Sequence, residues 1–476
     1  MSEEGAMASD VVPGARIAGG RRGGPKHLTV IEPATLRPLA EVALAEPADV
    51  TDAVEAAGRA GPEWAGREVR ARCAALRAVA ADLRAEVEPL ARLVTRETGK
   101  RIAEARAEVT FSADFFDWFA DLGHVLADEY RGYGQRRFVV RRKPVGVVAV
   151  LTPWNFPVSI PARKLAPALV AGCTAVFKPS ELTPLSGLRV AEILERHLPP
   201  GVVNTVVGDA DLGAALVAAD GVRGISFTGS TRVGGRIAAA AAPRFTRLVL
   251  ELGGRAPFVV CEDADPEAAL AALLVAKYRN NGASCIAAND VFVHERLYDE
   301  LTARFVERSL SLRVGDPLDE ATELGPVISA AEHARLDSLV GQARAAGLTV
   351  RQAEAVPAGG RFFPPTVVVE PPEDAPWDQE IFGPVAPIRR YRDEAELVAR
   401  INRWPQGLGG YVCSADLDHA TRLAERLDIG VIGINNGAPN TVEVPFGGFK
   451  ASGIGREGGV AGLEAFLEHQ MLSILA

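Results

Sequence analysis

Apolar and polar residues follow a regular alternation in the middle of the chain. From Val145 to Leu252, short runs rich in β-branched residues are separated by roughly 10–20 residues of helical composition. The runs are VGVVAVL, TAVFK, VVNTVV, GISFTG and RLVLEL. Strands that are apolar throughout and joined by helices form parallel sheets with helices on both faces. The pattern therefore predicts a parallel βαβ sheet, followed by a second αβ unit over about 253–444.

The segments on either side of this sheet have other patterns. Residues 1–24 predict a loose extension, whereas HLTVIEPAT and LAEVALA predict two short strands joined by a turn. Apolar residues at helical spacing predict helices from about Pro47 to Leu126. Tyr130–Lys143 and His469–Leu475 resemble strands, but neither segment has an evident partner nearby in the sequence.

Size and charge limit the classes of protein to which the chain can belong. A chain of 476 residues exceeds a single hydrophobic core, so we expect two or more domains. The net charge of -9 provides no basic surface for nucleic acid. The basic run RRFVVRRK alternates with apolar residues, which indicates a strand with one charged face. A nucleic-acid partner is therefore not expected.

Cysteine and histidine usage gives no sign of disulfides or of a metal. The five cysteines lack C-x-x-C spacing and the seven histidines lack ligand spacing, so no metal site is predicted. The first residues lack the apolar core of a secretion signal, and no run of about 18 apolar residues follows. We therefore expect a cytoplasmic protein without membrane contact.

Chemically informative residues follow the predicted strands of the parallel sheet. PWNFP follows the first, KPSE the second, Gly208 and Asp209 the third, TGSTRVG the fourth, and Glu251 ends the fifth. Ligands of such sheets bind at the carboxyl ends of the strands. TGSTRVG is a glycine-rich turn that opens a helix, where free N–H groups favour a phosphate, but it is not G-x-G-x-x-G. The turn alone is a weak sign of a nucleotide, and Lys178 and Glu181 strengthen it by offering groups for ribose hydroxyls.

Three residues suggest covalent catalysis, each beside an ordinary structural alternative. Cys285 follows the small residues GAS, which let a substrate approach a thiol, although an isolated cysteine is more often a core residue. Glu251 precedes two glycines and suits the activation of water, or it caps a helix or pairs with an arginine. Asn155 is either a turn residue or an amide donor to the oxyanion of a tetrahedral intermediate.

Motifs along the whole chain occur in an order that resembles NAD(P)-dependent aldehyde dehydrogenases. They are PWNFP, KPSELTP, FTGSTRVG, LELGG, the Gly282–Cys285 loop, EIFGPV and PFGGFKASGIGRE. The resemblance covers the chain from about Gly24 onward. It implies an α/β fold with a Rossmann-type parallel-sheet cofactor domain, an α/β catalytic domain and a small β oligomerisation domain.

The same resemblance implies domain boundaries and an assembly. It assigns 25–126 and 145–252 to the cofactor domain and 253–444 to the catalytic domain. The oligomerisation strands are then 127–144 and 463–476, which would explain the two strand-like segments without local partners. A homodimer or homotetramer is expected.

The resemblance also implies a role for each residue of the site. Cys285 is the nucleophile, Asn155 and the Cys285 N–H form the oxyanion hole, and Glu251 is the general base for hydrolysis of a thioester. CoA-acylating members of the family typically lack that glutamate, so hydrolysis is expected. The implied cofactor contacts are Thr152, Pro153, Trp154, Lys178, Ser180, Glu181, Gly208, Gly229, Ser230, Leu252, Gly253, Glu380 and Phe382.

Glu181 bears on the choice of cofactor. A carboxylate accepts a hydrogen bond from the ribose 2′-hydroxyl but repels a 2′-phosphate. We therefore expect NAD, with NADP as the alternative.

Two arginines indicate an anionic aldehyde as the substrate. The resemblance places Arg163 and Arg279 along the substrate tunnel with Phe156 and Asn440, and both arginines match succinate-semialdehyde dehydrogenases, which the chain resembles most. A guanidinium group suits a carboxylate, unless it merely pairs with a neighbouring Asp or Glu.

The chain departs from the family pattern at several positions. Ala283 stands where the family usually has glutamine, Asn440 where succinate-semialdehyde enzymes have a carboxylate-binding serine, and Arg255 where Lys or Asn is commoner. Phosphonate, malonate and glutarate semialdehydes, a neutral aldehyde, or a non-catalytic binding role therefore remain alternatives. Ala287 replaces the second cysteine that forms a regulatory disulfide in some relatives, so no such redox switch is expected.

Overall fold

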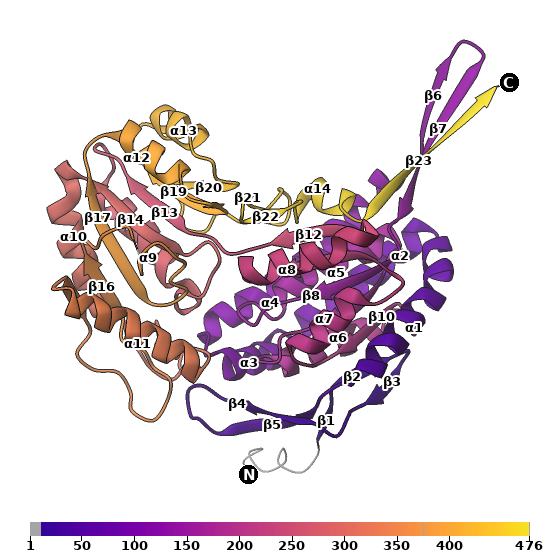
Figure 1. The fold of residues 1–476 in the computed structure, drawn as a ribbon, viewed down its shortest axis with the longest axis horizontal. Helices are drawn as coiled ribbons and strands as arrows, with labels where there is room; N and C mark the ends of the chain where they lie inside the picture. The colour runs from indigo at the N-terminus through magenta and orange to yellow at the C-terminus, as the bar shows by residue number, and fades with distance from the viewer. Residues whose placement is uncertain (1–10, 375, 476) are drawn as a thin grey trace.

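The fold consists of two α/β lobes and a small projecting sheet (Figure 1). The computed structural model describes residues 11–374 and 376–475. The first lobe contains an eight-stranded sheet and the second a seven-stranded sheet. The chain passes from the first lobe to the second after β12 (Arg247–Glu251), and its C-terminal part returns to the first lobe.

The eight-stranded sheet contains the five strands that the sequence predicts. They are β8 (Val147–Leu151), β9 (Thr174–Lys178), β10 (Val203–Val206), β11 (Val222–Thr228) and β12. Neighbouring strands in the order β12-β11-β8-β9-β10 pair in parallel. β8 and β9 are buried at every position because helices cover both faces of the sheet. The predicted parallel sheet is confirmed.

Helices pack on the two faces of this sheet. Alternate residues of β8 point to opposite sides, so Val148 and Val150 join one hydrophobic core and Val147 and Ala149 join another. The first core includes residues of α2 (Val69–Ala85), α3 (Val87–Thr98), α4 (Ile102–Asp121), α5 (Ser159–Ala171) and α6 (Pro184–Glu195). The second includes residues of α1 (Pro47–Gly66), α7 (Ala210–Ala218) and α8 (Thr231–Ala241). The helices predicted before Leu126 are confirmed, and the last of them ends in a 3-10 turn, Leu122–Leu126.

The N-terminal segment corrects the expectation of a loose extension over 1–24. β1 (Val12–Pro13) pairs with β5 (Pro38–Ala43), and β2 (Ala15–Ile17) and β3 (Gly20–Arg22) extend the eight-stranded sheet beyond β10. Strands of two or three residues are too short to show a period in the sequence, and distant segments hold them in place. Arg16 of β2, for example, forms ion pairs with Glu192 and Glu195 of α6. Residues 1–10 lie outside the described residues.

Two short strands follow this segment, as predicted. β4 (His27–Ile31) pairs with β5 in an antiparallel hairpin, and a turn joins them. Val30, Leu39 and Val42 pack against Leu188 of α6, so the hairpin covers one edge of the first lobe.

The seven-stranded sheet of the second lobe follows the order β15-β16-β17-β14-β13-β19-β20. Its strands are β13 (Ala256–Val260), β14 (Ala288–His294), β15 (Thr349–Gln352), β16 (Thr366–Val369), β17 (Val385–Tyr391), β19 (Gly409–Cys413) and β20 (Val431–Ile434). All adjacent pairs are parallel except β15 with β16. The helices of this lobe are α9 (Pro266–Tyr278), α10 (Glu295–Leu310), α11 (Ala330–Ala345), α12 (Glu394–Asn402) and α13 (Leu417–Glu425).

The C-terminal part of the chain joins the two lobes. β21 (Phe449–Lys450) pairs with β18 (Gln406–Gly407), and β22 (Gly453–Ile454) then adds to the eight-stranded sheet beside β12. Helix α14 (Gly459–Glu464) follows and leads towards the projecting sheet.

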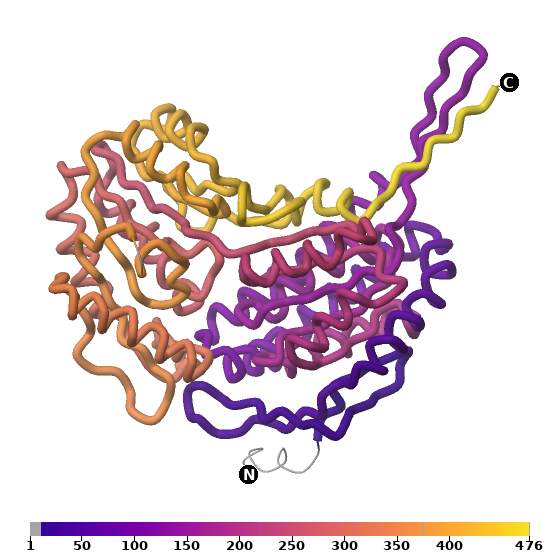
Figure 2. The backbone as a smooth tube through the Cα atoms, in the orientation of Figure 1, coloured from indigo at the N-terminus to yellow at the C-terminus, as the bar shows by residue number. Residues whose placement is uncertain are grey.

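The projecting sheet is built from the two segments that lacked a local partner. β7 (Arg136–Pro144) pairs antiparallel with β6 (Glu129–Tyr133) and with β23 (Leu467–Leu475) at the other end of the sequence. Figure 2 shows β23 running alongside the β6–β7 hairpin, away from both lobes. Tyr130, Tyr133, Met471 and Leu475 are exposed on it. Among the described residues, no helix is long and apolar enough to cross a bilayer.

Candidate active site

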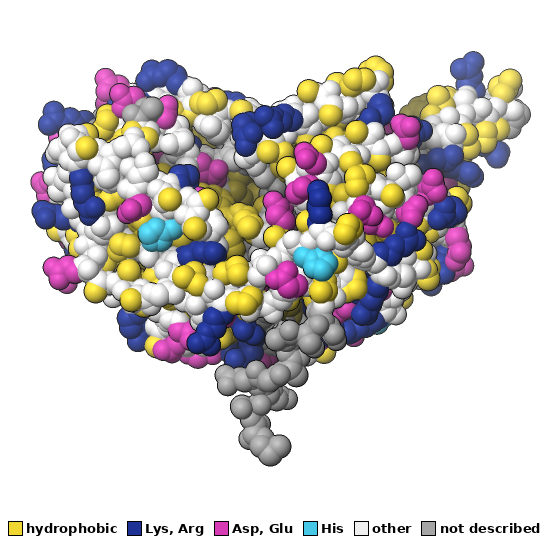
Figure 3. Space-filling view, turned by 60° about the horizontal axis from the view of Figure 1, so that its bottom comes forward, with side chains coloured by type: hydrophobic (Ala, Val, Ile, Leu, Met, Phe, Trp, Pro, Cys, Tyr) yellow, Lys and Arg dark blue, Asp and Glu magenta, His cyan; other side chains and the backbone are white. Residues whose placement is uncertain are grey.

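Two cavities meet at Cys285. A cleft of about 720 Å³ runs along the carboxyl ends of β8, β9, β11 and β12, and a second cavity of about 330 Å³ approaches from the side of α4 and α5. Ile160, Arg163, Cys285 and Phe446 line both. Figure 3 shows the surface hollowed between the two lobes, where hydrophobic side chains are visible. The cysteine therefore stands where two ligands can reach it from opposite sides.

The loop before Cys285 adopts an unusual backbone conformation. Asn280, Asn281 and Gly282 all have positive φ, at 55°, 58° and 76°. Asparagine and glycine tolerate this region better than other residues. A Cβ atom at position 282 would lie 2.4 Å from the Gly383 carbonyl oxygen, so glycine is required there. Since β14 begins at Ala288, the loop presents Cys285 just before a buried strand.

The protein environment favours the neutral thiol of Cys285. Burial, together with the carboxylates of Glu380 and Glu251, raises the pKa of the Cys285 thiol to about 12. Arg163 and Arg279 act in the opposite direction and favour the thiolate. Since the thiolate is the nucleophile, the reactive form requires removal of a proton when a substrate binds.

Asn155 lies beside the cysteine loop and is held at both ends. Its side-chain amide donates to the Ala283 carbonyl oxygen at 3.0 Å, and its own backbone carbonyl accepts from Lys100 Nζ and Asn280 Nδ2, each at 2.9 Å. An amide nitrogen carries two hydrogens, so one N–H is left for a ligand oxygen. The geometry supports the oxyanion role that was predicted from the sequence.

A buried ion pair supports the segment that carries Asn155. Lys100 and Glu108 contact each other with almost no exposure to solvent. The Glu108 carboxylate accepts from the backbone N–H groups of Val158 and Ser159 at 2.9 and 3.2 Å. The Lys100 ammonium lies 4.1 Å from the centre of the Phe156 ring. Sequence reasoning did not identify this pair, since Lys100 lies in the short connection between α3 and α4 and Glu108 lies in a stretch of ordinary helical pattern.

Glu251 is a buried carboxylate without a hydrogen-bond partner on either oxygen among the described residues. Burial raises its pKa well above the usual value, and the nearby negative charge of Glu457 adds to the effect. Lys164 and Arg163 favour the ionised form. A carboxylate with a raised pKa at the end of β12 is a stronger base than an ordinary carboxylate and is suited to accept a proton.

A second buried ion pair lies behind Glu251. Lys164 of α5 contacts Glu457 Oε1 and donates to Ser226 Oγ at 3.1 Å. The other carboxylate oxygen of Glu457 has no hydrogen-bond partner among the described residues, and it lies 3.8 Å from Arg163 Nη1. Glu457 ends the motif PFGGFKASGIGRE, but nothing in that motif pairs it with Lys164, because the two residues come from distant segments.

The large cleft brings together almost all residues predicted to contact a cofactor. Thr152, Pro153, Trp154, Lys178, Ser180, Glu181, Gly229, Ser230, Leu252, Gly253, Glu380 and Phe382 line it. Gly208 does not, although the adjacent Asp209 does, because Gly208 packs closely against Leu212. Residues that sequence reasoning missed include Val233, Ile237 and Ala240, whose spacing along α8 was the available signal.

Several groups in this cleft suit a dinucleotide. Ser230 caps α8 by accepting from the Val233 N–H, so the N-terminus of that helix opens into the cleft. Lys178 is the last residue of β9, and its Nζ lies 3.6 Å from Oε2 of Glu181 in the loop that follows. Ribose hydroxyls can bind to both groups. Burial lowers the pKa of Lys178, and this glutamate partly restores it.

The inner end of the cleft contains a carboxylate and two aromatic rings. Burial raises the pKa of Glu380 to about 7, and its Oε1 accepts from the Gly254 N–H at 3.5 Å. Trp154 and Phe382 meet edge to face, with ring centroids 5.5 Å apart. These groups flank the approach to Cys285. The flat ring of a cofactor would have to lie there to react with a substrate attached to the Cys285 sulfur.

The smaller cavity contains all four predicted substrate residues, Phe156, Arg163, Arg279 and Asn440. Arg163 stacks on Phe446, 4.4 Å from the ring centre. Arg279 Nη1 donates to Asn440 Oδ1 at 3.4 Å. Glu104 also lines this cavity, and its carboxylate accepts from the Asn280 N–H. Arg163 Nη1 lies 3.8 Å from Glu457 Oε2, whereas Arg279 forms no ion pair with any residue that the structure describes, so Arg279 is the better candidate to bind an anion.

Known proteins share this sequence and fold. A model of the aldehyde dehydrogenase family matches residues 21–472. The chain is 38% identical to a glutarate-semialdehyde dehydrogenase of Pseudomonas putida over 94% of each chain. It is 39% identical to an NADP-dependent succinate-semialdehyde dehydrogenase of Escherichia coli over 89% of each chain.

Solved structures agree with these relatives. A succinate-semialdehyde dehydrogenase from Burkholderia pseudomallei superimposes with a TM-score of 0.95 at 38% identity, covering 99% of this chain and all of the other. A betaine aldehyde dehydrogenase from Staphylococcus aureus in complex with NAD+ gives 0.94 at 32% identity, covering 97% and 94%. The chain belongs to the aldehyde dehydrogenase family and is an NAD(P)-dependent oxidoreductase.

Proposed function

We propose that the protein oxidises a short aldehyde with a terminal carboxylate, succinate or glutarate semialdehyde, to the dicarboxylic acid. The observation that carries this proposal is the cavity at Cys285 with Arg163 and Arg279 on its wall. Guanidinium groups bind carboxylates through charge-assisted hydrogen bonds. Relatives named for both semialdehydes support the same substrate class.

Cys285 begins the reaction in the proposed mechanism. As the aldehyde binds, the Cys285 thiol releases its proton to solvent water, and the thiolate adds to the aldehyde carbon. The carbonyl oxygen becomes an alkoxide that receives hydrogen bonds from Asn155 Nδ2 and the Cys285 N–H. Lys178, Ser230, Glu380 and Phe382 would hold NAD(P) in the large cleft, where it would supply the acceptor for a hydride. Loss of that hydride from the former aldehyde carbon leaves a thioester on Cys285.

Glu251 completes the reaction. It takes a proton from a water molecule, whose oxygen adds to the thioester carbon, and the C–S bond then breaks to release the acid. Burial and Glu457 keep the pKa of Glu251 high, so this carboxylate is a stronger base than an exposed one. The presence of this base supports hydrolysis rather than transfer to CoA.

The substrate proposal is tested with two aldehydes of equal length. NADH formation is measured with succinate semialdehyde and with butyraldehyde, for the wild type and for Arg279→Gln. The variant should lose about 10–100-fold in kcat/KM for the semialdehyde only, since a hydrogen bond to a charged group contributes about 1.5–3 kcal/mol. Arg106→Gln, at a partly exposed arginine outside both cavities, is the control. Preference of the wild type for butyraldehyde would refute the proposal.

We further propose that NAD is preferred over NADP. Glu181 lines the cleft beside Lys178, where its carboxylate would accept from a ribose 2′-hydroxyl and repel a 2′-phosphate. Glu181→Ser should raise kcat/KM for NADP by about tenfold, which corresponds to about 1.4 kcal/mol. Equal use of both cofactors by the wild type would contradict the preference.

The other parts of the molecule support a division of labour in a homo-oligomer. We propose that the eight-stranded lobe binds the cofactor, that the seven-stranded lobe supplies Cys285, and that β6, β7 and β23 bind a second copy through their exposed apolar residues. Light scattering should give a dimer or tetramer, and Leu475→Asp should weaken it. The five free cysteines support our proposal of a cytoplasmic location.

A further inference from the structure

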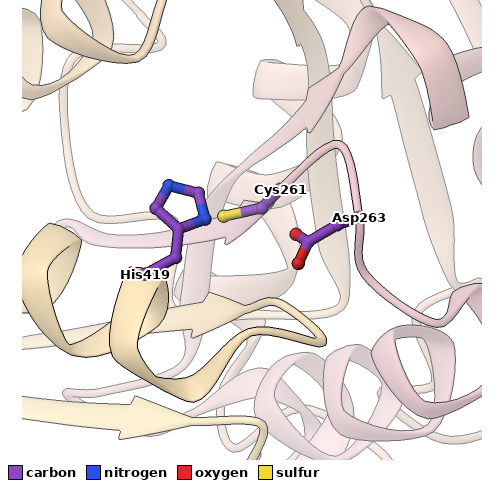
Figure 4. A group of neighbouring side chains, drawn as sticks. All are labelled: Cys261, Asp263 and His419. Atoms are coloured by element: carbon purple, nitrogen blue, oxygen red, sulfur yellow. The ribbon is translucent and has the colours of Figure 1, made fainter.

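A cluster of potential metal ligands lies at the carboxyl edge of the seven-stranded sheet, apart from Cys285. Cys261 directly follows β13, Asp263 lies two residues later, and His419 occupies the first turn of α13. One ligand atom from each lies within 4.8 Å of the others. Figure 4 shows the three side chains converging between the strand end and the helix. None of them lines either cavity at Cys285.

His419 is oriented by a carboxylate on the side away from the cluster. Its Nε2 lies 2.6 Å from Glu394 Oε2 on α12, and the other oxygen of Glu394 accepts from Arg426 at 2.7 Å. Nδ1 is therefore the nitrogen available to a ligand, and Figure 4 shows it on the side of the Cys261 sulfur. A histidine that binds a metal through one nitrogen usually donates from the other to a carboxylate or carbonyl.

Asp263 is an ionised group at the accessible side of the cluster. Burial alone would raise the pKa of its carboxyl, but hydrogen bonds from the Asp416 N–H and the Ser414 hydroxyl hold that pKa below the usual value. Its side chain is exposed, whereas Cys261 is only 1% exposed. An ion can thus reach the sulfur past Asp263 without opening the core.

The charges around the sulfur favour a cation. Besides burial, the carboxylates of Glu394, Asp263 and Glu262 raise the pKa of the Cys261 thiol. Arg296 pairs with Glu262 and Arg426 with Glu394, and the Tyr391 ring packs beneath the site in the same core as Cys261. Asp263 has no arginine or lysine partner among the described ion pairs. These carboxylates disfavour the negatively charged thiolate of Cys261. A bound divalent ion would outweigh them and stabilise the thiolate.

We propose that Cys261, Asp263 and His419 bind one Zn²⁺ ion, with a water molecule in the fourth position. Sulfur, imidazole nitrogen and carboxylate are zinc ligands, whereas Mg²⁺ and Ca²⁺ select oxygen alone. Bonds of about 2.0–2.3 Å in a tetrahedron separate ligand atoms by about 3.3–3.8 Å. Binding therefore draws the three donors together by no more than about 1.5 Å and releases the thiol proton to solvent.

The site would link three elements that contribute nothing to catalysis directly. Zinc would join the end of β13 to α13, while Glu394 connects α12 through His419. Occupancy should raise the melting temperature of the protein because the ion binds the folded chain. The kcat for aldehyde should stay the same with or without zinc, since the cluster lies outside both cavities.

Cobalt absorption tests the proposal on the full chain. Cys285→Ala serves as the background, which removes the thiol of the active site as a competing ligand. Titration with Co²⁺, followed by displacement with Zn²⁺, should give one ion per chain and a sulfur-to-cobalt charge-transfer band. Cys261→Ala should abolish that band, and His419→Gln should weaken binding at least 100-fold. Glu394→Gln should weaken it by about 10–100-fold, as expected for a carboxylate that orients a ligand.

Cys413→Ala is the matched control. Cys413 is buried on the adjacent strand, where its carbonyl accepts from the Cys261 N–H, but its sulfur is outside the cluster. This variant should retain the band. Absence of a band in the background protein, or a band that survives both Cys261→Ala and His419→Gln, would overturn the proposal. His419→Gln changes a half-buried side chain, so it provides the answer even if Cys261→Ala fails to fold.

Discussion

Two buried lysine–glutamate pairs flank Cys285, and they differ in how fully the oxygens of the glutamate are hydrogen-bonded. Lys100–Glu108 lies under the segment that carries Asn155, and Lys164–Glu457 lies behind Glu251. Lys100 and Lys164 are 1% and 0% exposed. In the first pair the carboxylate also accepts from two backbone N–H groups. In the second pair, one oxygen of Glu457 and both oxygens of the nearby Glu251 have no hydrogen-bond partner within the part of the chain that the structure describes.

The first pair is a fixed support, whereas the second pair lies beside a carboxylate that can gain and lose a proton. A buried ion pair is tolerated when additional hydrogen bonds satisfy its charges, and the first pair meets that condition. The second pair places Lys164 near two carboxylates that repel each other, which is the arrangement that raises a carboxyl pKa. We therefore expect the first pair to set the geometry of acylation and the second to set the pH dependence of hydrolysis.

The largest effect is expected when the base itself is removed. Glu251→Gln should reduce kcat by about 10²–10⁴-fold, the usual contribution of general base catalysis. A single turnover should still release NADH, because Cys285 and Asn155 are unchanged. Rapid mixing should therefore show a burst, and mass spectrometry should detect the acyl group on the protein. A variant that forms no acyl-enzyme would mean that Glu251 is needed before hydrolysis.

Removal of Lys100 should affect both stability and acylation. Lys100→Met leaves Glu108 as an unpaired buried charge, which costs about 3–5 kcal/mol of unfolding free energy. The Asn155 carbonyl also loses one of its two donors, so kcat should fall while KM for the semialdehyde changes little. Denaturant unfolding and the rate of the NADH burst measure the two effects.

A double variant distinguishes support from simple destabilisation. Lys100→Met with Glu108→Gln removes both charges and keeps the amide oxygen as an acceptor for the Val158 and Ser159 N–H groups. Stability should largely return, whereas the burst rate should stay low because Asn155 still lacks the Lys100 contact. Full recovery of the burst rate would show that Lys100 has no positioning role. A large rise in KM for the semialdehyde alone would instead indicate that Lys100 binds the substrate carboxylate.

Removal of Lys164 should act on pH dependence. The ammonium lowers the pKa of Glu251, so Lys164→Met raises that pKa further. Hydrolysis requires the ionised base, and therefore the acid limb of the kcat profile should move to higher pH. The burst rate should change much less than in Lys100→Met. Profiles of kcat and of the burst rate against pH, recorded side by side for the wild type and Lys164→Met, test this.

The sequence could predict the sheet and its ligand edge because both depend on local pattern. The apolar runs that form β8 to β12 and the motifs after them are visible without the fold. The two ion pairs are different: Glu108 and Lys164 occur in helices and Lys100 in the connection between α3 and α4, where charged residues are normally exposed. Their burial depends on α4 packing against α5 and on the return of the C-terminal segment with Glu457.

The backbone around Cys285 was equally hidden from sequence reasoning. Asn280 and Asn281 resemble ordinary polar residues, yet their left-handed conformation and their side-chain bonds to Asn155, Gly99 and Pro326 shape the loop. The strands of two or three residues near the N-terminus were missed for the same reason. In each case partners far along the chain, rather than neighbours, determine the structure.

The smallest effect is expected from the hydroxyl that completes the second pair. Ser226 Oγ accepts from Lys164, and Ser226→Ala removes this bond while Glu457 still pairs with the lysine. Loss of one buried hydrogen bond to a charged group should lower the unfolding free energy by about 1.5–3 kcal/mol. The acid limb of kcat should stay in place, because the positive charge near Glu251 is retained. If Ser226→Ala moved that limb as far as Lys164→Met, the hydroxyl rather than the ammonium charge would set the pKa of Glu251.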